Sequence, residues 1–215
     1  IALNLLIKKM YLKNSKNEYY IKELFLFNEI INLCQDITSF CEKTNNISMK
    51  SQIQTRLAEI YFIHEHYSQS LEIYNKVVFD LKRYEDNLGL IKLLLLESKI
   101  YYATNGISKS KAALTSVKTL VTKVYIEPKL QANIDLHAGI LAAYEKDYNL
   151  AYSYFFEAFD VYNIPTQRKK EKALKAFLYM IMSKIVGDRI EEVNNVVLSK
   201  QGKDYYGNEV EALKV

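Results

Sequence analysis

The sequence predicts an all-α protein built from a stack of helix pairs, and three observations lead to this prediction. One pattern of small and bulky residues occurs three times, with successive copies 40 and then 41 residues apart. The 215 residues include only 6 Gly and 2 Pro, which favours long helices over a loop-rich all-β fold. Apolar residues also recur at helical spacing through most of the chain. Such a stack presents surface to other proteins and seldom carries out chemistry itself.

The repeated pattern has the form expected of two helices joined by a turn. Each copy opens with a small residue, a second small residue follows twelve positions later, and two core positions follow sixteen and nineteen positions after the first. Small residues let the two helices approach, while bulky residues fill the groove between them. The copies are Ala58, Ser70, Tyr74 and Val77; Ser98, Ser110, Leu114 and Val117; and Gly139, Ala151, Phe155 and Ala158.

The beginning of the chain predicts two further helices. Residues 1–13 are mostly apolar and read as a helix, which the polar residues 14–17 end. Residues 18–43 carry apolar side chains at helical spacing and predict a long helix. Residues 44–48 predict a polar turn before the repeats begin.

Three helix pairs correspond to the three copies of the pattern. Pro128 suits the first turn of a helix, where its missing N–H costs nothing. The Asn105-Gly106 dipeptide predicts a helix end, with Gly106 in the left-handed conformation. The expected pairs are 50–66 with 68–86, 88–105 with 108–125, and 128–146 with 149–162.

A fourth, degenerate pair follows the three clear copies. Asp188 and Glu191 predict a capping box at the start of its second helix, with Asp in place of the usual Ser or Thr. The expected segments are helices at 166–186 and 188–199, a turn at 205–208, and the first part of another helix at 209–215.

The length of the repeat identifies the type of helical repeat only in part. Tetratricopeptide repeats recur about every 34 residues and armadillo-type pairs about every 40 to 47 residues. This chain has tetratricopeptide-like internal spacing within a unit of about 40 residues. The extra residues must therefore lengthen the helices or the loops between repeats.

The net charge and the two cysteines indicate which kinds of partner and which cellular compartment to expect for this protein. The net charge is +4 with a pI near 8.8, a mild bias that falls short of a nucleic-acid footprint. Cys34 and Cys41 are seven residues apart on one predicted helix, about 10 Å along its axis, which is too far for a disulfide. We expect both to be reduced core thiols in an intracellular protein.

No segment reads as a membrane span or as a signal peptide. No apolar run approaches the length that a membrane span needs. Residues 1–7 are mostly apolar, but Lys8 and Lys9 follow them, which is the reverse of the order in a signal peptide. Because the chain lacks an initiator Met, we expect it to be a piece of a longer protein.

The histidines are the first candidates for a metal site, and their spacing argues against such a site. On a helix His64 and His66 would point about 200° apart, so they could not share one metal ion. Zinc-binding helices use positions i and i+4 instead. His137 has no acid or cysteine at ligand spacing, so a packing or surface role is the expectation.

Charged residues give two further candidates. A basic cluster at 168–175 opens a predicted helix, and we expect it to be a solvated face or a contact with an acidic neighbour rather than a nucleic-acid site. Asp135 with Glu145, and Glu191 with Glu192, could be acid–base pairs, but solvated helix carboxylates are the expectation. The basic cluster consists of Arg168, Lys169, Lys170, Lys172 and Lys175.

An aromatic run in the third repeat could form either a core or a peptide groove. Its helical spacing favours the core between repeats, and exposure of Tyr152 or Tyr154 would favour a binding surface. The run consists of Tyr144, Tyr148, Tyr152, Tyr154, Phe155, Phe156, Phe159 and Tyr162. No phosphate-binding loop, nucleophile elbow or Cys–His dyad signature is present in the sequence.

Several segments resemble one known family in collinear order across nearly the whole chain. The family is the non-ATPase lid subunit of the 26S proteasome regulatory particle that carries a helical-repeat arm and a PCI module, numbered eleven in one common scheme. The resemblance is strong over 57–162, where solvent-facing residues match as well. The matching segments are Leu93–Ala103, KAALTSVKTL at Lys111–Leu120, PKLQANIDLHAGI at Pro128–Ile140, AYSYFFEAFDVY at Ala151–Tyr162 and GNEVEALK at Gly207–Lys214.

The resemblance implies a right-handed solenoid and a scaffold role in ubiquitin-dependent degradation. Residues 1–49 would be N-terminal helices, 50–200 the helix-pair repeats, and 201–215 the start of a helix leading to a C-terminal winged-helix module. Implied partners are other lid subunits, an ATPase-ring subunit and the α-ring of the core particle, in cytoplasm and nucleus. The resemblance brings no catalytic residue, metal or cofactor, and no nucleic acid, membrane or small-molecule substrate. Partner-binding residues stay unknown at this stage.

Two rival functions stay open on the sequence alone. The homologous signalosome subunit has a similar arm, although the matches at exposed positions favour the proteasome. A stand-alone peptide-binding repeat adaptor would need a concave face with convergent Lys, Arg or Asn side chains. An enzyme is the weakest reading, because it would need a pocket of perturbed titratable groups.

Overall fold

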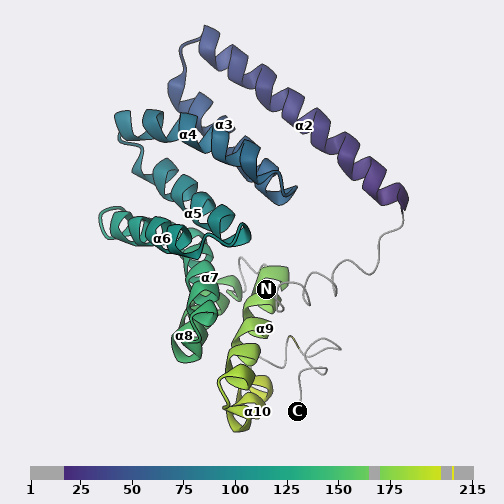
Figure 1. Ribbon diagram of the computed structural model, residues 1–215, viewed down its shortest axis with the longest axis vertical. Coiled ribbons are helices and arrows are strands. Elements are labelled where there is room, and N and C mark those ends of the chain that lie inside the picture. The colour runs from purple at the N-terminus through teal and green to yellow at the C-terminus, as the bar shows by residue number, and fades with distance from the viewer. Residues whose placement is uncertain (1–16, 165–169, 200–204, 206–215) are drawn as a thin grey trace. The chain divides into compact units, whose positions relative to one another are not determined.

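The computed structural model describes residues 17–164, 170–199 and 205, and the regular structure within these ranges is entirely α-helical (Figure 1). The helices follow one another in a repeat-like arrangement, so the predicted all-α helical solenoid is confirmed. Their bounds are α2 Asn17–Lys43, α3 Ile47–Ile63, α4 Tyr67–Arg83, α5 Asn87–Ala103, α6 Ile107–Val121, α7 Pro128–Tyr144, α8 Tyr148–Tyr162, α9 Lys170–Val186 and α10 Ile190–Leu198.

The chain forms two compact units, Ile1–Glu85 and Asp86–Val215. In the first unit α3 packs against both α2 and α4. In the second unit α5 packs on α6, α7 on α8, and α9 on α10, while α8 also packs against α9 (Figure 1). Each unit is thus a stack in which consecutive helices supply each other's apolar contacts.

The three predicted helix pairs are confirmed, with shifts at their ends. Helix α3 begins at Ile47, earlier than predicted, because the Asn46 side chain accepts a hydrogen bond from the backbone N–H of Met49 at 3.1 Å. Asp86 and Asp147 cap α5 and α8 in the same way, at 2.8 and 3.1 Å. Helix α6 ends four residues before the predicted Tyr125.

Short turns of one recurring type join most consecutive helices. In the first of them, the N–H of Asn46 bonds to the carbonyl of Cys41 at 2.9 Å and the N–H of Asn45 to Glu42 at 3.2 Å, which is the Schellman pattern. The middle residue of each turn has a positive φ between 53° and 66°, although glycine occupies none of these positions. These residues are Asn45, Glu65, Glu85, Asn105, Lys146 and Asp188.

The turn geometry corrects two predictions. Gly106 is not the left-handed residue: Asn105 has φ 61°, and Gly106 has φ −82° and caps the start of α6. Asp188 does not form a capping box, because it is itself the left-handed residue of its turn, with φ 58°. Arg189 occupies the N-cap position of α10 and makes no side-chain cap hydrogen bond. Asn and Asp tolerate the left-handed conformation better than most residues, which explains both assignments.

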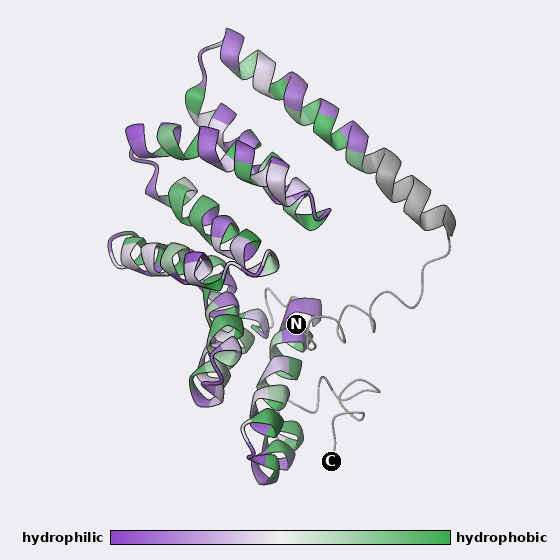
Figure 2. Ribbon diagram, in the orientation of Figure 1, coloured by the Kyte–Doolittle hydropathy of each residue, from purple (hydrophilic) through white to green (hydrophobic). Residues whose placement is uncertain are grey.

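The core lies where the repeat pattern places it, and apolar residues alternate with polar ones along the helices of each unit (Figure 2). The two small residues of each copy are buried, as are Val77, Val117 and Ala158. At Gly139 the approach is close, since a Cβ built there would lie 2.5 Å from Cε1 of Phe155. The proposed function of the small residues, to let paired helices approach, is therefore confirmed.

Some sequence predictions fall outside the residues that the structure describes. They are the helix at 1–13, the polar break at 14–16, the first residues of the helix predicted from 166, the turn beyond Tyr205, and the helix at 209–215.

Candidate interaction surface

The candidate residues of the chain fall into three groups: a buried polar network, a set of surface charges, and an aromatic surface. His137 belongs to the first group. Its Nε2 lies 2.8 Å from Oγ of Ser98, whose hydroxyl donates to the carbonyl oxygen of Ser110 at 2.7 Å. The Ser110 hydroxyl returns a 2.7 Å hydrogen bond to the carbonyl oxygen of Ser98.

This network determines the tautomer and the protonation state of His137. Because the single Ser98 hydroxyl proton goes to Ser110, we assign the imidazole proton to Nε2, which then donates to Ser98 Oγ. Burial lowers the pKa of His137 to about 3, with a contribution from the charge of Lys99. His137 is therefore neutral at physiological pH, and its predicted packing role is confirmed.

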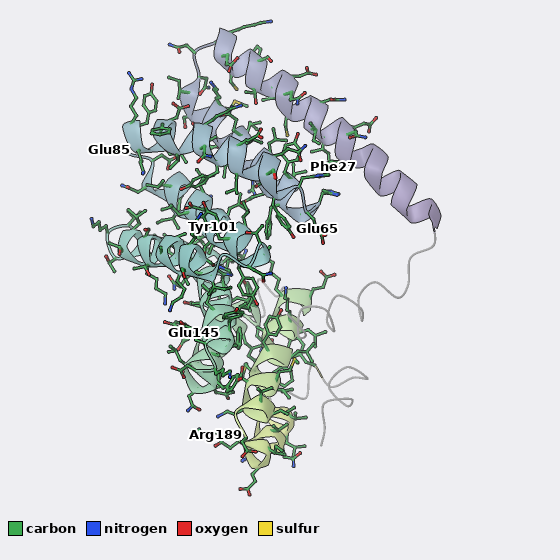
Figure 3. All side chains as sticks on the ribbon, in the orientation of Figure 1. Phe27, Glu65, Glu85, Tyr101, Glu145 and Arg189 are labelled. Carbon is green, nitrogen blue, oxygen red and sulfur yellow. The ribbon has the colours of Figure 1, made fainter. Side chains whose placement is uncertain are left out.

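His64 and His66 do not lie on a helix, so the premise of the i and i+2 argument is wrong. Helix α3 ends at Ile63, and the two histidines flank the left-handed residue Glu65 (Figure 3). Both rings pack on Phe27 of α2, with centroid separations of 4.0 and 5.5 Å. Within the ranges that the structure describes, no group of three or more His, Cys, Asp or Glu side chains is placed to hold a metal ion.

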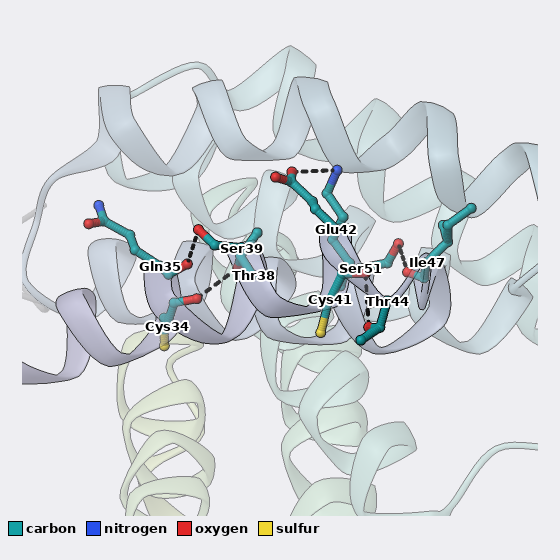
Figure 4. Close-up of polar contacts among 10 residues, drawn as sticks. Cys34, Gln35, Thr38, Ser39, Cys41, Glu42, Thr44, Ile47 and Ser51 are labelled. Carbon is teal, nitrogen blue, oxygen red and sulfur yellow. Dashed lines mark hydrogen bonds and ion pairs between the residues drawn. The ribbon is translucent and has the colours of Figure 1, made fainter.

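Cys34 and Cys41 are both free and buried, as predicted for core thiols. They lie on α2 among hydrogen bonds that side chains of the same helix make to its own carbonyls, such as Thr38 Oγ1 to Cys34 O at 2.7 Å (Figure 4). Burial raises the pKa of the Cys34 thiol, which makes it less reactive. An ion pair of 3.0 Å between Lys50 and Glu42 links α3 to α2.

Within the basic cluster, Lys172 contacts the neighbouring helices α7 and α8, whereas Lys175 contacts its own helix α9. Lys172 Nζ donates to Asn133 Oδ1 at 3.1 Å and lies 5.7 Å from the Tyr162 ring centroid. Tyr162 donates to the same Asn133 oxygen at 2.8 Å. Lys175 lies 5.7 Å from the centroid of the Tyr179 ring, and desolvation lowers its pKa although part of the side chain reaches solvent. The cluster residues at 168 and 169 lie outside the described ranges.

Three of the four carboxylates considered as acid–base partners, Asp135, Glu145 and Glu192, each contact a different side chain. Asp135 accepts a 2.9 Å hydrogen bond from Gln131, and burial raises its pKa. Glu145 pairs with Lys111 at the end of α7, about 15 Å further along the helix axis from Asp135. Glu192 pairs with Lys184 at 2.5 Å, which lowers the pKa of the Glu192 carboxyl. Asp135 thus takes part in a hydrogen bond within α7, and Glu145 and Glu192 take part in ion pairs between helices.

The aromatic run divides into a core part and a surface part. Phe155, Phe159 and Tyr162 are buried, in agreement with the core prediction. Tyr152 is half-buried and Phe156 is 42% exposed, and these two rings stack with centroids 6.5 Å apart. The condition set for a binding surface, exposure of Tyr152 or Tyr154, is not met, because both side chains are half-buried, and Phe156 is exposed instead.

Tyr152 and Phe156 form one wall of a groove between α8 and α10, above α9. The groove has a volume of about 440 Å³. Phe159, Phe177 and Met180 also contribute to its lining. Its other wall comes from α10, with Glu192, Asn195, Val196 and Ser199.

Sequence reasoning missed this groove because its two walls belong to different repeats. The signal available was the widened apolar stripe of α8, which adds Tyr152 and Phe156 to the buried positions. A wide stripe is equally consistent with a helix wedged between two neighbours, and the groove appears only once α10 is placed among the described residues.

The fold and these contacts define a helical-repeat protein. Sequence relatives are more specific. The 26S proteasome non-ATPase regulatory subunit 11 homolog of Arabidopsis thaliana is 34% identical over 184 residues, 86% of this chain and 43% of the relative. The probable 26S proteasome regulatory subunit rpn6 of Schizosaccharomyces pombe has the same identity and coverage. Subunit RPN6 of Saccharomyces cerevisiae is 33% identical over 85% of this chain and 42% of its own length.

The resemblance inferred from the sequence is therefore confirmed: over most of its length this chain is homologous to these 26S proteasome regulatory subunits. It spans 43% of the length of the first of them. No family model matches the chain.

Among solved structures, the crystal structure of BtubC (BKLC) from P. vanneervenii superposes with a TM-score of 0.58. The two sequences are 10% identical, and the match covers 87% of each chain, so it concerns the fold alone. Within the residues that the structure describes, none of the helices has the length and apolar character that crossing a bilayer requires.

Proposed function

We propose that this chain is the helical-repeat part of a 26S proteasome lid subunit and acts as a non-catalytic scaffold in ubiquitin-dependent protein degradation. The observation that carries the proposal is the collinear similarity of 34% over 86% of the chain to a subunit named for that complex. Proposed partners are other lid subunits, an ATPase-ring subunit and the core-particle α-ring, in cytoplasm and nucleus.

The mechanism that we propose is rigid spacing. Stacked helix pairs bury a continuous core within each unit and hold surface residues in a fixed register. The contact between Gly139 and the Phe155 ring, and the buried Ser98–Ser110 hydrogen bonds, support stiffness because they leave paired helices little freedom to slide. Such an element transmits position between partners rather than carrying out chemistry.

Affinity purification of the full-length tagged protein from its own cells, followed by mass spectrometry, tests the proposal. We expect ATPase-ring and lid subunits to be recovered at near-equal stoichiometry. Recovery of the signalosome subunits, or of chaperone clients without a lid subunit, would overturn the assignment. A matched sample carrying Gly139→Leu should recover fewer lid subunits, because overpacking the helix crossing disturbs the scaffold.

A further inference from the structure

We propose that the groove between α8 and α10 is the docking site of the chain's own C-terminal segment, residues 207–215, which lies outside the described residues. The groove has a volume of about 440 Å³, which corresponds to several apolar side chains. Its walls and floor come from three consecutive helices, so a docked segment would contact α8, α9 and α10 together. Its apolar lining consists of Tyr152, Phe156, Phe159, Phe177 and Met180.

Tyr205 brings the chain to one end of this groove. Its ring lies 5.5 Å from the ring centroid of Phe159 and 6.0 Å from that of Phe177. Its hydroxyl donates to Asn163 Oδ1 at 2.7 Å, and Asn163 is the residue that follows α8. The C-terminal segment, which begins two residues after Tyr205, therefore starts beside the groove lining.

The lining is buried where Tyr205 contacts it and exposed further along α8. Phe159 and Phe177 are each 1% exposed. Phe156 lies about 4.5 Å from Phe159 along the helix axis and is 42% exposed, and its neighbour in the groove, Tyr152, stacks on it. Because a large exposed ring adjoins rings that are fully buried, we infer that the residues after Tyr205 continue the cover that this tyrosine begins.

The C-terminal segment has the length and the reach that this position requires. Along the axis of α8 the groove extends from Tyr152 to Phe159, about 10 Å. Residues 209–215, which the sequence predicts to begin a helix, would span about the same length. Val210 follows Tyr205 by five residues, over which an extended chain covers up to about 18 Å, so the whole groove is within reach.

The side chains of the segment suit an aromatic lining. Val210 and Leu213 are three residues apart and would share one face of a helix. Charge agrees with this placement, since the segment has two acids and one lysine and the floor helix α9 has four lysines and one acid. Glu192, the acid of the described lining, is paired with Lys184 at 2.5 Å and so does not repel the segment.

Docking would give this part of the stack the cover that helical repeats need. A repeat leaves apolar surface exposed unless a neighbouring or terminal element packs on it. Phe156 is surface of this kind, and the C-terminal segment would bury it. The orientation of residues 207–215 would then be set by packing on α8, α9 and α10 rather than by a free linker.

Hydrogen exchange of the full chain, followed by mass spectrometry, tests the docking. An isolated helix of seven residues is not stable in water, so slow exchange of residues 210–215 requires a tertiary contact. We expect their amides to exchange at least about tenfold more slowly than in a synthetic peptide of residues 205–215. Exchange at the rate of the free peptide would overturn the proposal.

Variants in the groove locate the contact. Phe156→Ala should bring the exchange of residues 210–215 close to the rate of the free peptide, while the amides of α9 keep their protection. Phe79→Ala is the matched control, because Phe79 is 73% exposed on α4 and does not line the groove. Protection that survives Phe156→Ala, or that Phe79→Ala removes as well, would place the segment elsewhere and overturn the proposal.

Reciprocal variants lie in the segment itself. Leu213→Asp should speed exchange in α10, because that wall loses its cover. Glu211→Gln is the control, since on a helix Glu211 would point about 200° away from Leu213. Equal exchange of α10 in both variants would show that Leu213 does not contact this wall, which contradicts the proposed docking.

Dilution separates docking within one chain from docking onto a second copy. Protection within one chain does not depend on protein concentration, whereas protection by a second copy does. We expect unchanged protection on dilution and a monomer in sedimentation. Protection that is lost on dilution, together with a dimer, would identify the segment of a second copy as the occupant and overturn the proposal. None of these readouts depends on the proteasome assignment, so the two proposals can fail separately.

Discussion

Two helix crossings occupy equivalent positions in successive repeats and are built from different chemistry. Between α5 and α6, Ser98 and Ser110 exchange hydrogen bonds, each hydroxyl donating to the other residue's carbonyl at 2.7 Å. Between α7 and α8, Gly139 lies beneath the Phe155 ring with no room for a Cβ. The first crossing is held by hydrogen bonds between buried polar groups, and the second by close steric packing. The same pattern of small residues in the sequence therefore gives two crossings that should respond to different mutations. The first should be sensitive to the loss of a hydrogen bond, and the second to added side-chain volume.

The crossing in the first repeat combines both solutions. Ser70 donates to the carbonyl oxygen of Ala58 at 2.7 Å, so one small residue supplies a hydrogen bond and the other supplies only space. The series shows that the repeat selects size at these positions, while polarity is free to vary as long as each buried hydroxyl finds an acceptor. His137 uses this freedom, because it extends the polar crossing into the next helix pair.

The largest effect that we expect is a loss of folding stability at acidic pH, which arises from His137 at the polar crossing between α5 and α6. His137 has a folded pKa of about 3, below its ordinary value of 6.5, so between these pH values the unfolded chain binds a proton that the folded chain excludes. The free energy of unfolding should therefore fall as pH decreases through this window, by on the order of 4 kcal/mol from this one group.

Urea denaturation at a series of pH values measures this dependence. His137→Gln should flatten the loss of stability between pH 6.5 and pH 3 relative to the wild type. Ser116→Ala is the control, since Ser116 is exposed on α6, bonds only within its own helix and carries no group that titrates in this range. Parallel curves for the wild type and His137→Gln would show that the buried imidazole does not couple folding to protonation.

The stability of the crossing between α7 and α8 should depend on the side-chain volume at position 139 rather than on pH. Gly139→Leu should lower the free energy of unfolding by about 3 kcal/mol, the upper part of the range for overpacked cores. The cause is the Phe155 ring, which is 2% exposed and has no free space to move into. Thermal unfolding followed by circular dichroism measures the loss. Adding Phe155→Leu should recover part of it, and strictly additive losses would contradict the contact.

Loss of one hydroxyl from the polar crossing should have a smaller effect. Ser98→Ala removes a second donor to the Ser110 carbonyl, which keeps its bond within α6, and removes the acceptor of the His137 N–H, leaving that buried donor without a partner. We expect a loss of about 2 kcal/mol. Ser116→Ala is the control, because Ser116 is exposed on α6 and bonds only to its own helix at Ala112. Equal losses for both variants would mean that burial of the network adds nothing.

The smallest expected effect is a gain at the turns. Lys146 and Glu65 have φ of 65° and 66°, a conformation that costs a residue with a Cβ roughly 1–2 kcal/mol. Replacing either with Gly should stabilise the protein by about 0.5–1 kcal/mol after the entropy of the unfolded chain is included. Asn105→Gly should gain less, because Asn tolerates this region. Chemical denaturation compares the three variants, and a loss at Lys146→Gly would contradict the turn geometry.

Much of the fold follows from local sequence, while the turns show where sequence reasoning failed. Helical periodicity located the three pairs because each helix has to bury an apolar stripe. The left-handed residues were missed because glycine was taken as their signal, and Glu, Lys and Asn occupy them instead. A Schellman turn also depends on carbonyls five residues back, which a dipeptide does not reveal.

The candidate surfaces depended more strongly on structure. His64 and His66 were placed on a helix by their neighbours, but the chain leaves the helix at Ile63 and turns both rings onto Phe27. Phe27 is 37 residues before His64, and no local pattern connects them. The groove between α8 and α10 has the same cause, since its walls come from repeats that meet only in the folded chain.

The sequence alone determined the all-α class, the helix pairs, the small residues at their crossings and the family to which the chain is homologous. These are properties of spacing, and spacing along one or two helices is set by the residues within them. Tertiary structure alone decided that Ser98 holds His137, that Phe155 covers Gly139, and that aromatic side chains of α8 line a groove beside α10. These are properties of which helices meet, and non-local packing determines them.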